Sequence, residues 1–342
     1  EIKKMILISY KSKSYKNFNV SNLGFNKFSI ISNIFERVIN EPFEMYRLRD
    51  LSIKKIIKLL KSKYSNSTNY DVSISYGSTM ISNLIGYSLR LKKKKLKIIT
   101  THHEHSGGFD AFNKNFYYFK VNFDEKDILE AVKKKKPNVV FFSHVSYVDG
   151  KKLDIPHLYK TIKKIDKNIM IILDIAQSFA INDNPFGYAD ILFCSLHKYI
   201  CGPYGYGIVW VKKRYVKVFD TLGGDKAPHN GCLGIRGGDN FISLLNAYVS
   251  LKLFFKNINK IPKLKKTLDI FLSKNFNLIN NKNNFISCIT SDKPLEKLYL
   301  KLRTKKISVK FFKDKNIIRI TIPFFYLKND VQNIINAIKI VN

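Results

Sequence analysis

The stretches of this chain that decide its fold are two apolar runs, each of which ends in polar residues. The first reads Ile169-Met170-Ile171-Ile172-Leu173 and continues as Asp174-Ile175-Ala176-Gln177. The second reads Ile191-Leu192-Phe193-Cys194 and continues as Ser195-Leu196-His197-Lys198. Runs of this length and β-branched content are typical of buried strands. They place an acid, an amide and a lysine at the carboxyl ends of strands, where open α/β sheets bind their ligands.

These side chains are the parts needed to hold pyridoxal phosphate. A lysine can form a Schiff base with the aldehyde, and a carboxylate such as Asp174 can keep the pyridine nitrogen protonated, so that the ring withdraws electrons from a substrate. The alternatives are that Lys198 is one more surface lysine and that Asp174 is a helix N-cap. The position of Lys198 between Ser195-Leu196-His197 and the glycine-rich Gly202-Pro203-Tyr204-Gly205-Tyr206-Gly207 favours the cofactor interpretation.

Strand-like and helix-like segments alternate from about residue 70 to residue 238. Strands are expected at residues 71–75, 96–100, 139–142, 169–173, 191–193 and 208–211. Helices are expected after Gly77-Ser78-Thr79 as far as residue 90, and at residues 125–135 and 157–164. This alternation predicts βαβ units and an α/β fold with a mostly parallel, doubly wound sheet and helices on both faces.

The pattern changes after residue 238. A long helix is expected at residues 241–255, and a lysine-rich stretch then leads to a helix at residues 268–278. Strands expected at residues 285–290, 307–311 and 317–322 alternate with helices expected at residues 295–303 and 331–340. We therefore predict a large domain over residues 1–255 and a small α+β C-terminal domain over residues 256–342.

The composition indicates a globular protein with an unusually high positive charge. The chain has 342 residues, of which 45% are hydrophobic, and its formal net charge is +34. Lysine is over-used together with asparagine, isoleucine, tyrosine and phenylalanine, which indicates a compositional bias spread over the chain. We therefore expect no specific nucleic-acid partner, and RNA binding is a hypothesis that rests on charge alone. The charge does favour anionic ligands, including a phosphorylated cofactor.

The cysteines and the apolar runs bound the environment of the protein. Its four cysteines, Cys194, Cys201, Cys232 and Cys288, show no CxxC spacing. This pattern is typical of a reducing compartment, which we expect to be the cytoplasm or an organellar matrix. No apolar run reaches the length that spans a bilayer, so we expect no membrane partner.

Taken in order, the motifs resemble those of the class V aminotransferases, the fold-type I family of pyridoxal phosphate enzymes that includes the cysteine desulfurases. The resemblance is good from residue 71 to residue 238, weaker in the C-terminal domain, and poor over the first seventy residues. It implies a fold-type I PLP-dependent transferase that is a homodimer with composite active sites and acts on an amino acid, a small-molecule substrate. A sulfur-acceptor protein is a further partner if the chain is a desulfurase.

The resemblance implies roles for residues of the cofactor site. Lys198 is similar to the Schiff-base lysine, Asp174 to the partner of the pyridine nitrogen, and Gln177 to the donor to the phenolate oxygen of the ring. Gly77-Ser78-Thr79 follows a strand and opens a helix, so it resembles the family's phosphate cradle, in which backbone N–H groups and the helix dipole face an anion. Two further residues are expected at the same phosphate, Ser195 and His197.

A histidine stacks on the cofactor ring and moves protons in this family. Within Thr101-His102-His103-Glu104-His105 we expect His103 in this catalytic role, with His105 as the second choice. The alternative is a metal site in which His102 and His105 share a helix face. Because no further Cys or carboxylate set clusters with them, we expect no metal.

Two residues are expected at the substrate. In the segment His144-Val145-Ser146-Tyr147-Val148-Asp149-Gly150, Tyr147 stands where the family usually has an asparagine that contacts the ring or the substrate. Arg319 resembles the arginine that grips the substrate α-carboxylate as a bidentate fork. The alternative for Arg319 is a surface arginine at a strand end.

The sequence departs from the family at two positions. Cysteine desulfurases carry a nucleophilic cysteine on a loop before the strand with the arginine, whereas residues 309–316 contain none. Cys201 and Cys288 lie elsewhere, and core packing is the more ordinary role for such cysteines. Gly238 stands where the family has a threonine that reaches the partner subunit's phosphate.

We therefore expect a PLP-dependent transferase or lyase that is cysteine desulfurase-like. Without the loop cysteine, C–S lyase, aminotransferase or epimerase chemistry is open, as is desulfuration by an unusual thiol. The alternative is a non-catalytic relative that serves as a binding or scaffold subunit.

Overall fold

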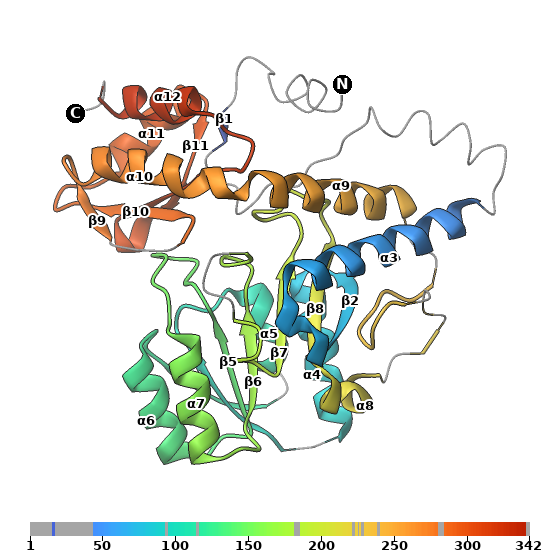
Figure 1. Ribbon diagram of the computed structural model, residues 1–342. Coiled ribbons are helices and arrows are strands. Elements are labelled where there is room, and N and C mark those ends of the chain that lie inside the picture. The colour runs from blue at the N-terminus through green and yellow to red at the C-terminus, as the bar shows by residue number, and fades with distance from the viewer. Residues whose placement is uncertain are drawn as a thin grey trace.

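The computed structural model describes residues 16–17, 44–92, 95–113, 116–180, 185–220, 223–224, 226, 229–237, 240–279 and 284–339. A lower unit is built around a large sheet, and the C-terminal part of the chain forms an upper unit (Figure 1). Helix α9 (Phe241–Asn257) runs over the lower unit and leads through η5 (Ile258–Lys260) into α10 (Ile261–Leu272) of the upper one. No helix within these ranges is long and apolar enough to cross a membrane.

The lower sheet has seven strands in the order β2-β8-β7-β6-β5-β3-β4. Their bounds are β2 (Tyr70–Tyr76), β3 (Lys97–Thr101), β4 (Tyr117–Val121), β5 (Val139–Ser143), β6 (Met170–Asp174), β7 (Ile191–Ser195) and β8 (Tyr206–Lys212). Strand β8 runs antiparallel to both of its neighbours, and the other neighbouring pairs are parallel. The predicted mostly parallel sheet is therefore confirmed.

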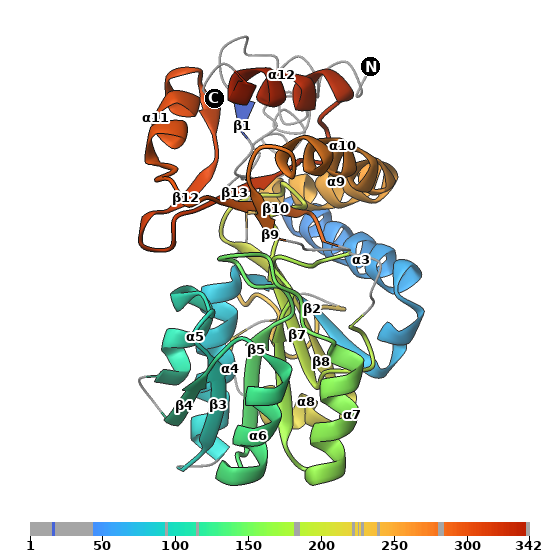
Figure 2. The ribbon, with the colours of Figure 1, turned by 90° about the vertical axis from the view of Figure 1, so that its left-hand side faces the viewer.

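Helices cover both faces of this sheet (Figure 2). One face packs against α4 (Ser78–Lys92), α5 (Ser106–Asn113) and α8 (Val216–Phe219), and the other against α3 (Glu44–Lys63), α6 (Glu125–Lys135) and α7 (Ile155–Ile165). Successive strand residues alternate between the two cores: Phe141 and Ile172 belong to the first, Val140 and Ile171 to the second. A strand that is buried on both faces needs apolar residues throughout, which explains the continuous apolar runs of the sequence.

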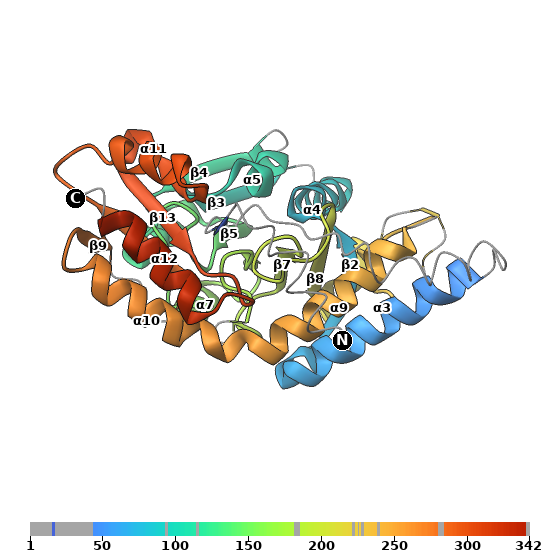
Figure 3. The same cartoon turned by 90° about the horizontal axis from the view of Figure 1, so that it is seen from above.

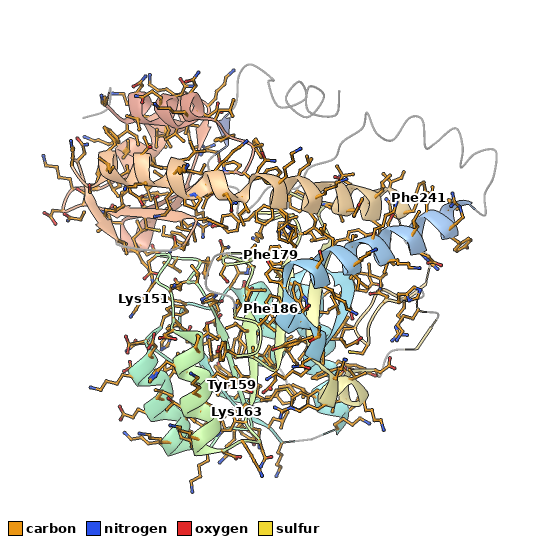
Figure 4. The ribbon with its side chains drawn as sticks, in the orientation of Figure 1. Lys151, Tyr159, Lys163, Phe179, Phe186 and Phe241 are labelled. Carbon is orange, nitrogen blue, oxygen red and sulfur yellow. The ribbon has the colours of Figure 1, made fainter. Side chains whose placement is uncertain are left out.

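Helix α3 lies in the N-terminal region where the family resemblance is poor. It packs beside α9 across the top of the lower unit (Figure 3). Below this pair, Phe179 and Phe186 join an aromatic cluster (Figure 4). Phe186 stacks on Tyr64, just after α3, at 4.5 Å, and Phe179 stacks on Trp210 of β8 at 6.0 Å. These ring contacts fix α3 to the sheet.

The upper unit contains a four-stranded antiparallel sheet in the order β12-β13-β10-β9. Its elements are β9 (Asn277–Ile279), β10 (Ile286–Thr290), α11 (Glu296–Thr304), β11 (Ile307–Ser308), β12 (Lys310–Phe312), η6 (Lys313–Lys315), β13 (Ile317–Thr321) and α12 (Lys328–Lys339). The predicted small α+β arrangement agrees with this, and the boundary at residue 255 stays a prediction. The sequence assigns residues 1–255 to the large domain, but β1 (Lys16–Asn17) pairs with β11.

Two predicted elements of the upper unit differ from the structure. The helix expected at residues 268–278 begins earlier, as α10, and residues 277–279 form β9 instead. Pro262 opens α10 in its first turn, and the lysines around it are good helix formers on an exposed face, so the lysine-rich stretch is helix and not linker. The strand expected at residues 307–311 is divided into β11 and β12.

Candidate active site

A pocket lies at the carboxyl ends of β2, β5, β6 and β7. Most of the residues expected from the sequence line it: Ser78, Thr79, Tyr147, Asp174, Gln177, Ser195, His197 and Lys198. They come from segments up to 120 positions apart, and they meet because parallel strands end at the same edge of a sheet. Of the remaining expected residues, His103 and Arg319 are not part of the lining.

One end of the pocket is a hydroxyl-lined helix terminus. Helix α4 begins at Ser78, whose backbone N–H donates to Ser195 Oγ at 2.9 Å and whose Oγ lies 2.7 Å from the same atom. A Cβ at Gly107 would lie 2.5 Å from Thr79 Oγ1 and 3.2 Å from His105 Nδ1, so the start of α5 approaches this end of the pocket closely. Hydroxyl donors at a helix N-terminus form a suitable site for a phosphate.

The centre of the pocket holds a carboxylate and an amine of altered acidity. Burial raises the pKa of Asp174 to about 6, although the N–H of Ala176 donates to its Oδ1 at 2.7 Å. Burial, followed by the charge of Arg319, lowers the pKa of Lys198 to about 8, and Asp174 opposes this effect. At neutral pH Asp174 is therefore mostly ionised, and Lys198 loses its proton far more readily than an exposed lysine.

Two buried polar atoms of the pocket wall have no hydrogen-bond partner among the described residues. They are Gln177 Oε1 and His197 Nδ1. The His197 ring stacks on Tyr204 with 4.8 Å between the ring centres, which fixes its plane. Because buried polar atoms are normally paired, these two atoms are available to a ligand in the pocket. The amide of Gln177 can turn to present either its oxygen or its N–H groups.

The structure places His105, the second choice from the sequence, in the pocket. Its ring lies 5.2 Å from that of Tyr147. Burial, then the charges of Lys198 and Arg319, lowers the pKa of His105, so the imidazole is neutral at pH 7. The N–H of Gly107 donates to its Nδ1 at 3.1 Å, and we infer that the ring proton is on Nε2.

His103, the first choice, lies outside the pocket. Its Nδ1 is 3.1 Å from Ser146 Oγ, and its ring stacks on Phe123 at 5.5 Å. Its Nε2 is 3.4 Å from Lys315 Nζ of the upper unit. The stacking role expected of His103 is therefore better suited to His105.

Glu104 explains why His105, and not His103, lines the pocket. The sequence analysis did not identify this role of Glu104. Its carboxylate accepts hydrogen bonds from Thr101 Oγ1 at 2.6 Å, from Ser143 Oγ at 2.6 Å and from the Ser143 N–H at 3.1 Å. These bonds fix the turn after β3, so that the next residue projects into the pocket. Burial, and to a lesser degree Asp174, raises the pKa of Glu104 to about 7. The pattern Thr101-x-x-Glu104 is the one sequence signal for this turn.

Arg319 lies at the edge of the site, on β13. It is 3% exposed, and its Nη1 donates to the carbonyl oxygen of Tyr147. Its guanidinium carbon is 5.6 Å from the ring of Phe312. The charge of Arg319 lowers the pKa of both Lys198 and His105, so it acts on the pocket electrostatically. Its proposed grip on a substrate carboxylate stays a prediction.

Two further expectations concern a metal and the partner's phosphate. Within the described ranges, no group of three His, Cys, Asp or Glu side chains is arranged to hold a metal ion. The helix face that His102 and His105 were to share does not exist, because α5 begins at Ser106. Gly238, expected at the family's threonine position, lies outside the described residues.

With this geometry established, the chain can be compared with known proteins. Residues 62–229 match the family model described as Aminotransferase class-V. Over this part the chain is similar to class V aminotransferases, as its motifs predict. It is 30% identical over 222 residues to the candidate cysteine desulfurase PbSufS of Plasmodium berghei (strain Anka), which is 60% of this chain and 37% of that protein. It is 28% identical over 199 residues to a candidate cysteine desulfurase of Ureaplasma parvum serovar 3, which is 55% of this chain and 46% of that protein. The chain thus spans less than half of the length of either curated relative.

Solved structures show the same fold at low identity. A cysteine desulfurase of Thermococcus onnurineus NA1 superposes with a TM-score of 0.76 at 16% identity, over 96% of this chain and 94% of that one. A NifS-like protein of Rickettsia africae gives 0.74 at 17%, over 96% and 99%. A serine palmitoyltransferase variant of S. paucimobilis with bound pyridoxal phosphate gives 0.68 at 13%, over 84% and 75%. The predicted fold-type I architecture is confirmed, and the family implies pyridoxal phosphate as the cofactor.

The pKa of Lys198 can be measured directly. An amine adds to an aldehyde only when it is deprotonated, so the reactivity of Lys198 should rise with pH and reach half of its maximum near pH 8. In Arg319→Gln, which removes a neighbouring positive charge, the midpoint should move to higher pH. Reductive alkylation with a small aldehyde, followed by peptide mass analysis, measures this, and the other lysines of the digest are internal references. A midpoint near the ordinary lysine value of about 10.4 would contradict the electrostatic argument.

Proposed function

We propose that this protein is a pyridoxal phosphate-dependent enzyme that acts on an amino acid and carries the cofactor on Lys198. The observation that carries the proposal is the meeting of four different groups in one pocket. An amine of lowered pKa, a buried carboxylate, a hydroxyl-lined helix terminus and a neutral imidazole are each required by a different part of the cofactor. A pocket without a cofactor has no physical reason to combine them.

The residues of the pocket fit the cofactor end by end. The α4 terminus, with Ser78, Thr79 and Ser195, would hold the phosphate, and Asp174 would keep the pyridine nitrogen protonated. The Gln177 side chain, whose Oε1 has no hydrogen-bond partner among the described residues, can bind the cofactor from the pocket wall. The cofactor, when bound, supplies a ring that withdraws electrons from the Cα of the substrate.

The side chains of the protein then have distinct tasks. Lys198 Nζ is deprotonated in a useful fraction of molecules near neutral pH, so it can accept the proton that leaves Cα. Asp174 is mostly ionised at pH 7 and would, by its charge, favour a proton on the ring nitrogen of the bound cofactor. His105 faces the pocket with Nε2–H, which orients a ring or an acceptor oxygen beside it. Arg319, in this proposal, orients the α-carboxylate.

We favour elimination or transamination as the reaction. Desulfuration, in which a cysteine of the chain itself would carry the sulfur as a persulfide, is less well supported. Residues 309–316 join β12 and β13 through the single turn η6 and contain no cysteine. All four cysteines are buried, and burial raises the pKa of Cys288 well above its ordinary value. A sulfur-transferring enzyme needs a thiolate that reaches its substrate. A sulfur-acceptor partner is proposed only for the case that such a thiol exists.

The cofactor proposal is tested by absorbance and reduction. The purified protein incubated with pyridoxal phosphate should absorb near the visible range, and borohydride should fix the adduct on Lys198. Lys198→Ala should lose both signals, because no other amine is placed in the pocket among the described residues, while Lys293→Ala on an exposed turn should keep them. An adduct on another lysine would overturn the assignment, and the absence of any band in the parent protein would favour a binding or scaffold subunit.

The thiol question has its own experiment. Incubation with cysteine should leave no added sulfur on the chain, because Cys288 Sγ is fully buried 3.8 Å from the Val148 carbonyl oxygen, whereas free sulfide can also come from elimination and does not decide the question. Mass analysis of the intact protein detects such an adduct, and Cys288→Ser is the matched control. A sulfur adduct that appears in the parent protein and is lost in Cys288→Ser would establish a relocated nucleophile and a desulfurase.

We also propose that the protein is a homodimer, as the family resemblance implies. Helix α4 exposes three large apolar side chains, Met80, Tyr87 and Leu91, each 49–56% accessible. This helix also forms the phosphate end of the pocket, so a second copy packed on it would complete the site. Light scattering of the purified protein should give twice the chain mass, and Tyr87→Glu should lower it toward one chain. A monomer in the parent protein would contradict the proposal.

A further inference from the structure

The hairpin of β12 and β13 places a second cation beside Arg319. In the ladder of these strands, Lys310 is directly opposite Arg319. Directly opposed residues of an antiparallel pair have their side chains on the same face, with Cβ atoms about 5 Å apart. The two side chains therefore start from neighbouring points on the side of the hairpin that carries Arg319.

Phe312 locates this face relative to the pocket. Its ring centre is 5.6 Å from Lys310 Nζ and 5.6 Å from the guanidinium carbon of Arg319. The same ring is 5.8 Å from the ring of Tyr147, which lines the pocket. Both cations thus lie around one phenyl ring that borders the pocket wall.

The electrostatic influence of Lys310 on the pocket agrees with this position. Its charge is among the causes that lower the pKa of Lys198 and of His105, in both cases together with Arg319. Charges that act on both groups from the same side make this edge of the pocket attractive to anions.

The other lysines of the hairpin, Lys313 and Lys315, contact residues outside the pocket. Lys313 forms an ion pair with Glu296 at 3.1 Å, and Lys315 lies beside His103, outside the pocket. In the part of the chain that the structure describes, no acidic side chain forms an ion pair with Lys310. Lys310 thus differs from the other lysines of the hairpin in its position, beside Arg319 and over the Phe312 ring.

We propose that Lys310 forms a second anion subsite, so that the preferred substrate is an α-amino acid whose short side chain carries an acid. The inference rests on the proposed function, in which Arg319 receives the α-carboxylate. Lys310 then receives the side-chain acid, and the short distance between paired residues restricts the two acids to a small molecule. A neutral side chain would leave Lys310 without a partner and gain nothing from it.

The experiment compares acidic amino acids with their amides. Calorimetric titration of the cofactor-loaded protein should show L-aspartate binding up to about fivefold more tightly than L-asparagine, because an exposed charge pair contributes at most about that much. Lys310→Gln should abolish this preference. Lys313→Gln, which removes the same charge three residues along the same hairpin, should keep it. The preference should also weaken as salt is added, since the contact is close to solvent.

A dicarboxylate without an amine separates this inference from the proposed function. Succinate and butyrate cannot react with a cofactor, so a preference for succinate that Lys310→Gln abolishes supports the subsite even if borohydride fixes nothing on Lys198. An equal affinity for aspartate and asparagine, and for succinate and butyrate, overturns the subsite. So does a preference that survives Lys310→Gln.

Discussion

The site depends on holding two opposite charges, Asp174 and Lys198, in a place where neither is well solvated. Burial is the largest cause that raises the pKa of the carboxyl group to about 6 and lowers that of the amine to about 8, so both are close to neutral pH. Each charge favours the charged form of the other, which limits the shift of both. Asp174 is the last residue of β6, and Lys198 follows the end of the neighbouring strand β7. Both strands are held firmly because both of their faces are packed. The hydroxyl groups and the imidazole are arranged around this pair.

The strand-end residues could be predicted from the sequence because their signal is local. An apolar run that stops at Asp174 or at Ser195 fixes both the strand and its exit, and parallel strands bring such exits together. The histidine could not be assigned in this way. Residues 102–105 have no periodicity, and their turn is set by the bonds of Glu104 to Ser143, which is 39 positions away. The choice between His103 and His105, which are two positions apart, therefore depends on a tertiary contact.

Other elements could not be predicted from the sequence, for related reasons. Strand β4 is an edge strand with Tyr117 and Tyr118 exposed, so it lacks the apolar run that marks its neighbours. Helix α10 begins among lysines that, without the partner surface, are equally typical of a linker. The start of α5 approaches Thr79 so closely that a Cβ at Gly107 would lie 2.5 Å from Thr79 Oγ1, and no local pattern predicts this contact. In each case the deciding atoms belong to a segment distant in the sequence.

The upper unit shapes the pocket through one loop of the lower unit. Residues 147–150 follow β5 and carry Tyr147, and three contacts from the upper unit hold their backbone. Arg319 donates to the carbonyl oxygen of Tyr147, Cys288 Sγ contacts that of Val148, and Asn284 Nδ2 donates to that of Gly150 at 2.7 Å. Because Tyr147 also borders Phe312, the wall of the pocket and the cationic hairpin are in direct contact. Salt screens exposed charges that lie more than about 10 Å from this wall. The charges that select a ligand are therefore the few that this loop and hairpin hold in place, and the loop is where a change of specificity would have to begin.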